Sequence, residues 1–426
     1  GTTLAKRPQP RGTTERQGKN FTMTTAKHQI LIVGGGSAGI SVAARLLRKG
    51  HTDVAVIEPS GMHYYQPLWT LVGGGQAKAS TTARSEASVM PKGAKWIKNA
   101  AASIEPDGRT VTCTDGATYE YDVLVVCPGI QLDWNRTEGL QDALGTDGVS
   151  SNYEYELAPR TWELIRDLRS GSAVFMMPSG PIKCAGAPQK IAYLASDYWR
   201  SQGVLDDIDV HLVVPTPRLF GIPAIADSLD AIAADYGITV HTNAEVTSVD
   251  AAAHKVGVTG VGVAGTGEAG SESMLAYDML HAVPRQSAPD WIKSSALSTG
   301  DATGYVEIDK HTMQHVRYRN VFSLGDAGSS PNSKTGAAIR MQAPVVVDNI
   351  EAFLRGRPLV AHYNGYASCP IVTSSHAMLL AEFDYDMKIT PSFPVINPTK
   401  PHRSYWYLKK YGLPFMYWNL MLKGLA

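Results

Sequence analysis

The sequence is poor in cysteine and has neither a net charge nor a long apolar run. Its four cysteines, Cys113, Cys127, Cys184 and Cys369, form no C-x-x-C pair and show no metal-ligand spacing. This pattern argues against a disulfide scaffold and a zinc site, and we predict no bound metal. No apolar stretch reaches the length of about 18 residues that a membrane-spanning helix needs. The 39 basic and 39 acidic side chains balance, so the chain has no overall attraction for nucleic acid.

The chain is long enough for more than one core. At 426 residues with 44% hydrophobic side chains, it is expected to form two or three domains. Residues 1–26 differ from the rest because they carry five basic side chains and a single acidic one, Glu15. We expect this leader to be disordered. It is interpreted either as the remnant of a mitochondrial presequence or as a stretch upstream of a start at Met23.

The residues around position 36 have the pattern of a dinucleotide-binding turn. A β-branched run at residues 29–33 is followed at once by G-x-G-x-x-G, then by a helical repeat, a strand at 54–57 and Glu58. In such a unit a pyrophosphate approaches the glycine backbone and the helix N-terminus faces its charge. Glu58 would accept a hydrogen bond from a ribose hydroxyl. The predicted phosphate-binding residues are Gly34, Gly36, Ser37, Ala38 and Gly39.

A second strand-turn-helix unit begins at residues 172–177, but its turn has a different composition. In a flavoprotein that uses a nicotinamide, this turn would be a second phosphate cradle. Here Pro181 and Pro188 remove backbone donors that a pyrophosphate would need. The turn carries Lys183 and Cys184 instead, and a nearby cation and a helix N-terminus both stabilise a thiolate. The unit is predicted to be a degenerate nucleotide-binding fold, in which Cys184 is either a redox thiol or an inert buried cysteine.

Two further stretches of the first unit are expected near the cofactor. The strand at 123–126 ends at Cys127-Pro128-Gly129, and we interpret Cys127 as a small buried residue at a strand end. Cys113 is expected in an ordinary hairpin. The aromatic segment at 59–69, which includes Gln66, is either a loop packed by its own side chains or a wall of the cofactor pocket.

The stretch from Asn320 predicts another contribution to the cofactor site. Its strand ends at Gly325-Asp326, and the carboxylate of Asp326 suits a ribityl hydroxyl. Lys334 and Thr335 then precede a long helix. A lysine and a helix N-terminus aimed at one place can stabilise the anion of a reduced flavin ring.

The last residues of the chain combine aromatic, apolar and basic side chains. From Arg403 onward the sequence has seven aromatic residues and no acidic one. We expect a pair of interfacial helices, broken at Gly412–Pro414, that lies on a bilayer surface. The alternatives are a dimer interface and a cap on the core.

Taken together, these motifs resemble sulfide:quinone oxidoreductase, a branch of the two-dinucleotide-binding-domain flavoproteins. The likeness runs from about Lys27 to Leu425 and is greatest to the mitochondrial-type enzymes and their bacterial relatives. The stretches that carry it are Glu58–Ser60, His63–Gly73, Gly129–Asp133, Pro181–Lys190, Gly325–Asp326, Ser333–Thr335, Tyr366–Pro370 and Ala381–Tyr385.

The resemblance implies a chemistry. It implies noncovalent FAD, with Cys184 and Cys369 as a redox pair; the residues themselves add Lys183 beside Cys184, where its charge would lower the pKa of the leaving thiol. Hydrogen sulfide would attack at Cys369, leave a persulfide there and release Cys184 as thiolate. Electrons would pass to FAD and on to a membrane quinone, ubiquinone or menaquinone. The sulfur would pass to a small acceptor such as glutathione, sulfite, cyanide or sulfide.

The resemblance also implies the architecture and the setting. The fold class is α/β, with two Rossmann-like domains, an FAD domain and a degenerate NAD-like domain, and a C-terminal amphipathic membrane-docking segment. We expect a peripheral protein of the mitochondrial inner membrane or bacterial cytoplasmic membrane, and a possible homodimer. The predicted divisions are a leader at 1–26, the FAD domain at 27–150 and 277–355, the NAD-like domain at 151–276, and the redox-cysteine and docking region at 356–426.

Two other functions stay open on the sequence. One is a nicotinamide-dependent reductase of quinones or disulfides, against which Pro181 and Pro188 argue. The other is a noncatalytic flavoprotein that senses redox state or serves as an interaction module.

Overall fold

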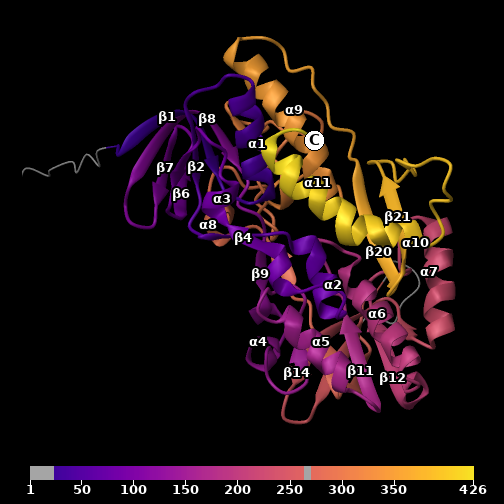
Figure 1. Ribbon diagram of the computed structural model, residues 1–426. Coiled ribbons are helices and arrows are strands. Elements are labelled where there is room, and N and C mark those ends of the chain that lie inside the picture. Colours follow the sequence, from indigo (N-terminus) through magenta and orange to yellow (C-terminus); the bar gives the residue numbers. More distant parts are fainter. Residues whose placement is uncertain (1–23, 263–269) are drawn as a thin grey trace, which may run out of the picture.

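The computed structural model of the protein describes residues 24–262 and 270–426. This part of the chain forms two units built on parallel strands, and a C-terminal segment lies across both (Figure 1). Most of the predicted leader, residues 1–23, and residues 263–269 lie outside the described residues.

The first unit is built on a mixed sheet that contains seven strands in the described ranges. Five strands pair in parallel, and β6, β7 and β8 form an antiparallel meander. Residues 30–33 and 54–57 are buried, which is typical of parallel strands covered on both faces. The strands are β1 Ala26–Val33, β2 Val54–Ile57, β5 Lys95–Ile97, β6 Ala101–Glu105, β7 Thr110–Cys113, β8 Thr118–Val126 and β19 Val321–Ser323.

The second unit has a five-stranded parallel sheet in the described residues, ordered β10-β17-β11-β12-β13. Its strands are β10 Val149–Ser150, β11 Gly171–Met176, β12 Ile208–Val213, β13 Thr239–His241 and β17 Met279–His281. An antiparallel group of β14 Ala244–Asp250, β15 Lys255–Gly260 and β16 Glu272–Ala276 adjoins it. β10 and β17 lie just outside the predicted limits 151 and 276, and the domain division itself stays a prediction.

Helices cover both sheets. α1 follows the first turn and packs against the long helix α9, beside it in Figure 1. α6 follows the second turn and packs on β11. The helices are α1 Ser37–Arg48, α2 Trp69–Gly73, α3 Glu86–Val89, α4 Leu140–Ala143, α5 Ala158–Asp167, α6 Ala187–Ser201, α7 Pro223–Tyr236, α8 Asp290–Lys293 and α9 Gly336–Leu354.

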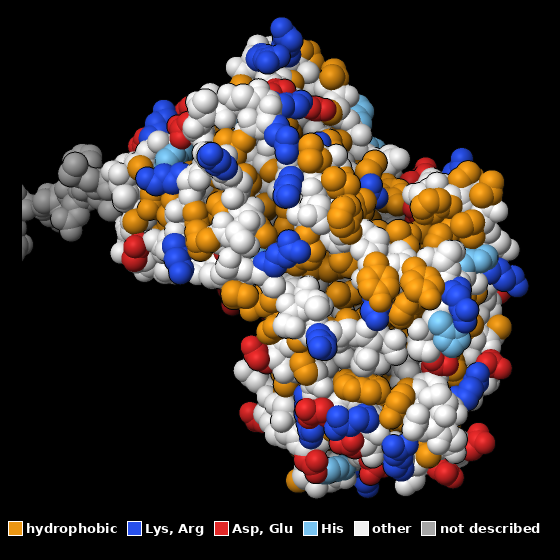
Figure 2. Space-filling view, viewed as in Figure 1, with side chains coloured by type: hydrophobic (Ala, Val, Ile, Leu, Met, Phe, Trp, Pro, Cys, Tyr) orange, Lys and Arg blue, Asp and Glu red, His pale blue; other side chains and the backbone are white. Residues whose placement is uncertain are grey.

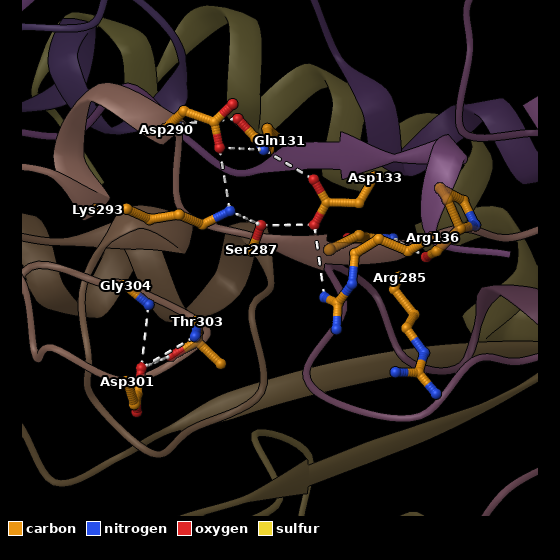
Figure 3. Close-up of polar contacts among 12 residues, drawn as sticks. Gln131, Asp133, Arg136, Arg285, Ser287, Asp290, Lys293, Asp301, Thr303 and Gly304 are labelled. Atoms are coloured by element: carbon orange, nitrogen blue, oxygen red, sulfur yellow. Dashed lines mark hydrogen bonds and ion pairs between the residues drawn. The ribbon is translucent and has the colours of Figure 1, made fainter.

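The two connections between the units pair with each other. β9 Gln131–Asp133 and β18 Arg285–Ser287 form an antiparallel ribbon. The Ser287 hydroxyl donates to the buried Asp133 carboxylate (2.5 Å) and accepts from the Lys293 ammonium (2.7 Å), as Figure 3 shows. Because these bonds join both connections, they fix how the units face each other and so shape the space between them.

The C-terminal segment starts with a hairpin that packs on α6. Its strands are β20 Ala367–Ser374 and β21 Ala377–Phe383. A separate two-stranded sheet, β3 Met62–Tyr64 and β4 Ala83–Ser85, lies in the first unit. β20 carries Cys369 at a position that pairs with Ala381 of β21. The hairpin therefore brings Cys369 to the helix that follows Cys184.

The helical end of the chain differs from the prediction at one point. The predicted break at Gly412–Pro414 is wrong, because α10 Arg403–Tyr407, a π-helical turn Leu408–Gly412 and α11 Leu413–Asn419 follow one another without a gap. Pro414 lies in the first turn of α11, where a missing N–H costs little. In the described ranges, no helix combines the length and apolarity needed to cross a bilayer.

Candidate active site

A cavity of about 680 Å³ opens between the two units and the C-terminal segment. Its wall takes residues from the first turn, the second turn, the start of α9 and the C-terminal helices. The site residues predicted from sequence line it, except Gly39 and Cys369. The predicted residues in the wall are Gly34, Gly36, Ser37, Ala38, Glu58, Gln66, Pro128, Gly129, Lys183, Cys184, Gly325, Asp326, Lys334 and Thr335.

The first turn has the shape that a pyrophosphate requires. A Cβ on Gly39 would lie 1.7 Å from the Gly34 carbonyl oxygen, so only glycine lets the helix start this close to the strand. A Cβ on Gly36 would meet nothing within 4 Å, which leaves the backbone open to a ligand. Glu58 accepts from the Gly35 N–H (3.0 Å) at the edge of the cavity. The turn predicted from sequence is therefore present, with its acidic residue in place.

The second turn brings the two candidate redox cysteines to the N-terminus of α6. Cys184 lines the cavity just before this helix and has a positive φ of 51°. Cys369 lies behind it, since a Cβ on Gly186, the residue that precedes the helix, would be 2.5 Å from the Cys369 sulfur. Ser368 and Pro370 face the cavity, and the side chain between them points to the opposite side of the strand. Both cysteines are free thiols in the structure.

A buried lysine lies next to Cys184, and its charge also acts on Cys369. The Lys190 ammonium lies 3.2 Å from the Cys184 sulfur, and its side chain is 1% exposed. Burial raises the pKa of the Cys184 thiol, but the charges of Lys190 and Lys409 outweigh this effect and hold the pKa below its usual value. Burial dominates for Cys369, whose pKa is raised although Lys190 opposes the shift. Cys184 is therefore the more stable thiolate of the two, and the better leaving group in thiol–disulfide exchange.

The expectation that Lys183 is the cation beside Cys184 needs correction. The Lys183 ammonium donates to the Gln66 side-chain oxygen (2.6 Å), and burial lowers its pKa. Lys190 takes the place next to the sulfur because helix side chains lean toward the N-terminus, so a lysine in the first turn reaches back to the preceding loop.

A second buried lysine approaches from the C-terminal segment. Lys409 lies in the π-helical turn, is 1% exposed, and donates to the Pro67 carbonyl oxygen (2.7 Å). Burial and repulsion by Lys190 lower its pKa to about 7, although both thiolates oppose the shift. The C-terminal segment thus adds positive charge to the thiol site.

At the second turn, an internal carboxylate accepts hydrogen bonds from the turn itself. Glu245 accepts from the Ser179 N–H (3.1 Å) and hydroxyl (2.6 Å), and Arg285 holds both of its oxygens at 2.9 Å. Two donors of this turn, the Ser179 N–H and hydroxyl, are therefore already paired. This agrees with the prediction that the second unit lacks a nucleotide function.

The remaining predicted residues lie near the start of α9. Thr335 caps this helix by accepting from the Ala338 N–H (3.2 Å). The Lys334 ammonium donates to the Gly328 carbonyl oxygen (3.0 Å) and lies 4.0 Å from the centre of the Tyr305 ring. Burial lowers the pKa of Lys334 to about 8, and the Asp326 carboxylate opposes this shift.

The structure also decides between the two interpretations of the aromatic segment at 59–69 and places Cys127 and Cys113. Residues 62–67 line it, so the aromatic segment is a wall of the pocket. Cys127 is buried at the end of β8 as predicted, and burial raises the pKa of its thiol. Cys113 lies buried in the hairpin strand β7, where burial raises its pKa to about 11.

Several residues of the site were not anticipated from the sequence. They are Lys190, Lys409, Glu245, His63 and Tyr417. A lysine inside an apolar helical run, as in Ala187–Leu194, is a signal that could have identified Lys190. The others meet the site only through tertiary packing.

Comparison with known proteins first gives the class. Residues 28–343 match the family model described as pyridine nucleotide-disulphide oxidoreductase. The match covers most of the chain and includes both turns, which places the protein in this class of two-domain oxidoreductases.

Close relatives then give the family. The chain is 40% identical over 399 residues to the mitochondrial sulfide:quinone oxidoreductase of Dictyostelium discoideum, covering 93% of this chain and 86% of that protein. It is 36% identical over 411 residues to the mouse (Mus musculus) mitochondrial enzyme of the same name, with 94% and 88% covered. The chain belongs to the sulfide:quinone oxidoreductase family.

A solved structure agrees in fold. The sulfide:quinone oxidoreductase of the hyperthermophilic bacterium Aquifex aeolicus superposes with a TM-score of 0.75 at 19% identity, covering 93% of this chain and 91% of that one. As a family member, the protein is an FAD-dependent oxidoreductase. The open face at Gly36 and the acceptor Glu58 fit that cofactor.

Proposed function

We propose that the protein oxidises hydrogen sulfide through the Cys184/Cys369 pair and delivers the electrons by way of FAD to a membrane quinone. The observation that carries the proposal is the placement of both thiols at the N-terminus of α6 beside the buried Lys190, with Cys184 at the wall of the cofactor cavity and Cys369 behind it. Helix N-terminus and lysine both favour thiolate at Cys184.

The electron and atom balance is simple. Each sulfide loses two electrons and becomes sulfane sulfur, and a quinone gains two electrons and two protons to become a quinol. With the pair oxidised, sulfide attacks the Cys369 sulfur, a persulfide forms there, and the bond to Cys184 breaks. Cys184 leaves as thiolate, which Lys190 stabilises. A small nucleophile such as glutathione, sulfite, cyanide or sulfide then takes the sulfane sulfur, and two electrons leave the pair.

FAD would supply the two-electron step between thiol and quinone. The residues proposed to hold it are Gly34, Gly36, Ser37, Ala38, Gly39, Glu58, Gln66, Pro128, Gly129, Gly325, Asp326, Lys334 and Thr335. The N-terminus of α9, capped by Thr335, offers backbone donors to the anionic form of the ring. Lys183 is placed at Gln66 and so would act at the cofactor as well as at the loop that carries Cys184.

The quinone would enter from the C-terminal side. This end of the cavity is lined by apolar residues of the hairpin, of the loop that follows it and of the last helices, among them Leu380, Phe393, Leu408, Leu413 and Met416. The same segment exposes Tyr407, Tyr411 and Phe415 next to Lys410, and Figure 2 shows hydrophobic and basic side chains together on this face. We propose that these residues, the docking face, rest on the mitochondrial inner membrane or, in a bacterial host, on the cytoplasmic membrane.

Vesicle sedimentation tests the docking face. Replacing Tyr411 and Phe415, which are 58% and 63% exposed, by serine should release most of the protein from vesicles that contain anionic lipid. Met274→Ser is the matched control, because Met274 is 57% exposed on the second unit. Equal sedimentation of all three proteins would contradict the proposal. If a second copy covers this face instead, the serine variant would lose concentration-dependent association measured without lipid.

Turnover tests the activity. Purified protein should reduce a short-chain quinone when sulfide and sulfite are present, and NADH should not replace sulfide. Turnover with NADH would favour the nicotinamide-dependent reductase, and no turnover with either donor would favour the noncatalytic flavoprotein.

A further inference from the structure

A buried polar chain links α11 to the phosphate turn. The Tyr417 hydroxyl lies 2.8 Å from the Ser37 hydroxyl and also bonds the Nε2 atom of His63. The Nδ1 atom of His63 faces the Gly35 carbonyl oxygen (3.2 Å) and the Glu86 carboxyl (3.3 Å). Tyr417, His63 and Glu86 are all 4% exposed or less. Tyr417 and Ser37 are 380 residues apart in the sequence, so these hydrogen bonds connect α11 to the predicted phosphate turn.

The direction of these bonds follows from the groups at the ends. The Gly35 carbonyl can only accept, so Nδ1 of His63 carries a proton and donates. With Nε2 as the acceptor of the ring, the Tyr417 hydroxyl donates to it and accepts from the Ser37 hydroxyl. Each hydroxyl is therefore held in one orientation, and Ser37 is the first residue of α1, whose N-terminus faces the pyrophosphate.

A second observation points to a ligand at the same place. The Oε1 atom of Glu86 is buried without a hydrogen-bond partner, and Glu86 lines the cavity. A Cβ on Gly35 would lie 2.7 Å from this oxygen and 2.8 Å from the Cβ of Glu58. A buried, unpaired carboxylate oxygen costs free energy unless a donor reaches it. A ribose hydroxyl is such a donor, and Glu58 beside it is the predicted ribose acceptor.

The C-terminal helices have one set of aromatic residues buried against the first unit and another set exposed on the surface. Tyr417 and Trp418 are buried against the first unit, where Tyr417 packs on Tyr65 at 4.6 Å between ring centres and Arg84 lies 4.2 Å from the Trp418 ring. Tyr411 is exposed on the docking face. The segment is therefore a cap on the core as well as a surface, and Figure 1 shows it beside α1.

We propose that Tyr417 is a positioning residue of the FAD site: together with His63 and Glu86 it fixes Ser37 at the phosphate turn, so that FAD retention depends on the packing of α11. The protein would lose its cofactor more readily whenever this segment lifts away. The inference concerns cofactor binding and does not require that sulfide be the substrate.

The test compares two single-hydroxyl changes on one segment. Tyr417→Phe removes the hydroxyl of the chain, and Tyr411→Phe removes an exposed one. FAD release after dilution, followed by flavin fluorescence, should be about tenfold faster for Tyr417→Phe, which corresponds to ~1.4 kcal/mol, and unchanged for Tyr411→Phe. The thermal stabilisation that added FAD gives the apoprotein should also shrink for Tyr417→Phe alone. A merely structural role would lower the melting temperatures of apo- and holoprotein equally and leave FAD release unchanged, which would overturn the proposal.

Hydrogen exchange tests the proposal without any variant. If FAD and α11 are coupled, FAD binding must slow amide exchange across residues 413–419 in the unmodified protein. Equal exchange of this stretch in apo- and holoprotein, with slower exchange at the phosphate turn, would contradict the coupling.

Discussion

The two strand-turn-helix units of this protein use the same local geometry for opposite purposes. In the first unit, the turn between β1 and α1 is open at Gly36 and leaves a helix N-terminus free for a phosphate. In the second unit, the corresponding turn is closed by Glu245, and the N-terminus of α6 faces Cys184 and Cys369. A helix N-terminus stabilises negative charge of either kind, phosphate or thiolate. The side chains of the turn decide which anion the helix serves.

The largest effect is expected at Gly39, a position of the first turn where the structure leaves no room for a side chain. Gly39→Ala puts a Cβ 1.7 Å from a backbone oxygen, so the turn must shift. Overpacking of this kind costs about 3 kcal/mol, and FAD should bind more than about a hundredfold more weakly. The flavin content of the purified protein measures this.

The matched change in the second unit is Gly186→Ala, whose Cβ would meet the Cys369 sulfur. It should keep normal FAD content and lose the reaction with sulfide. If both variants lose FAD alike, the two turns do not have separate tasks.

An effect of intermediate size is expected from Lys190, the buried cation in the first turn of α6. Lys190→Met removes the charge that lowers the pKa of Cys184, so that pKa rises and less thiolate is present at pH 7. Alkylation of Cys184 at this pH should therefore slow, by up to about tenfold for each unit by which the pKa rises.

Lys183→Met is the control for this experiment, because the Lys183 ammonium lies on Gln66. Its pH profile of alkylation should shift less. A larger shift for Lys183→Met than for Lys190→Met would restore Lys183 as the cation that activates the thiol.

The smallest effect is expected at the closed end of the second turn. Glu245→Gln removes a charge held by Arg285, and the free energy of unfolding should fall by about 1 kcal/mol at pH 7 with FAD content unchanged. Burial raises the pKa of Glu245, but Arg285 and Ser179 outweigh this effect and hold the pKa in the folded state below its usual value.

The sign of the pH dependence follows. The stabilisation that Glu245 gives the wild-type protein is complete above the usual pKa of a glutamate. It is lost as the pH falls through the lower pKa that Glu245 has in the folded state. The free energies of unfolding of the wild-type protein and of Glu245→Gln, measured in urea, should therefore differ at neutral pH and converge in acid. A constant difference at all pH values would mean that the carboxylate charge contributes nothing.

Local motifs explain what the sequence could predict. The first turn was predictable because the positions of Gly34, Gly36 and Gly39 depend only on the turn itself, and Cys184 was predictable at a helix start because the helical pattern begins directly after it. Lys190 was missed because the reach of its side chain depends on helix geometry. Tyr417 was missed because its partner Ser37 lies 380 residues away, a contact that only tertiary packing creates.

The C-terminal segment shows the same limit. The sequence predicts that its aromatic residues share one bilayer-facing surface, with a dimer interface and a core cap as the alternatives. In the structure, Tyr405, Tyr417 and Trp418 are buried while Tyr411 and Phe415 are exposed. Helical spacing alone could not separate these sets, because the π-helical turn changes the residues' angular positions partway along.

The most direct test of the account is the visible spectrum of the purified protein during anaerobic titration with sulfide, compared with Cys369→Ser. The account predicts that sulfide bleaches the flavin bands of the wild-type protein, that a long-wavelength charge-transfer band appears, and that the variant keeps its flavin oxidised at normal FAD content. Flavin that sulfide reduces equally well in Cys369→Ser would show that the electrons do not pass through the cysteine pair, and would contradict the central claim.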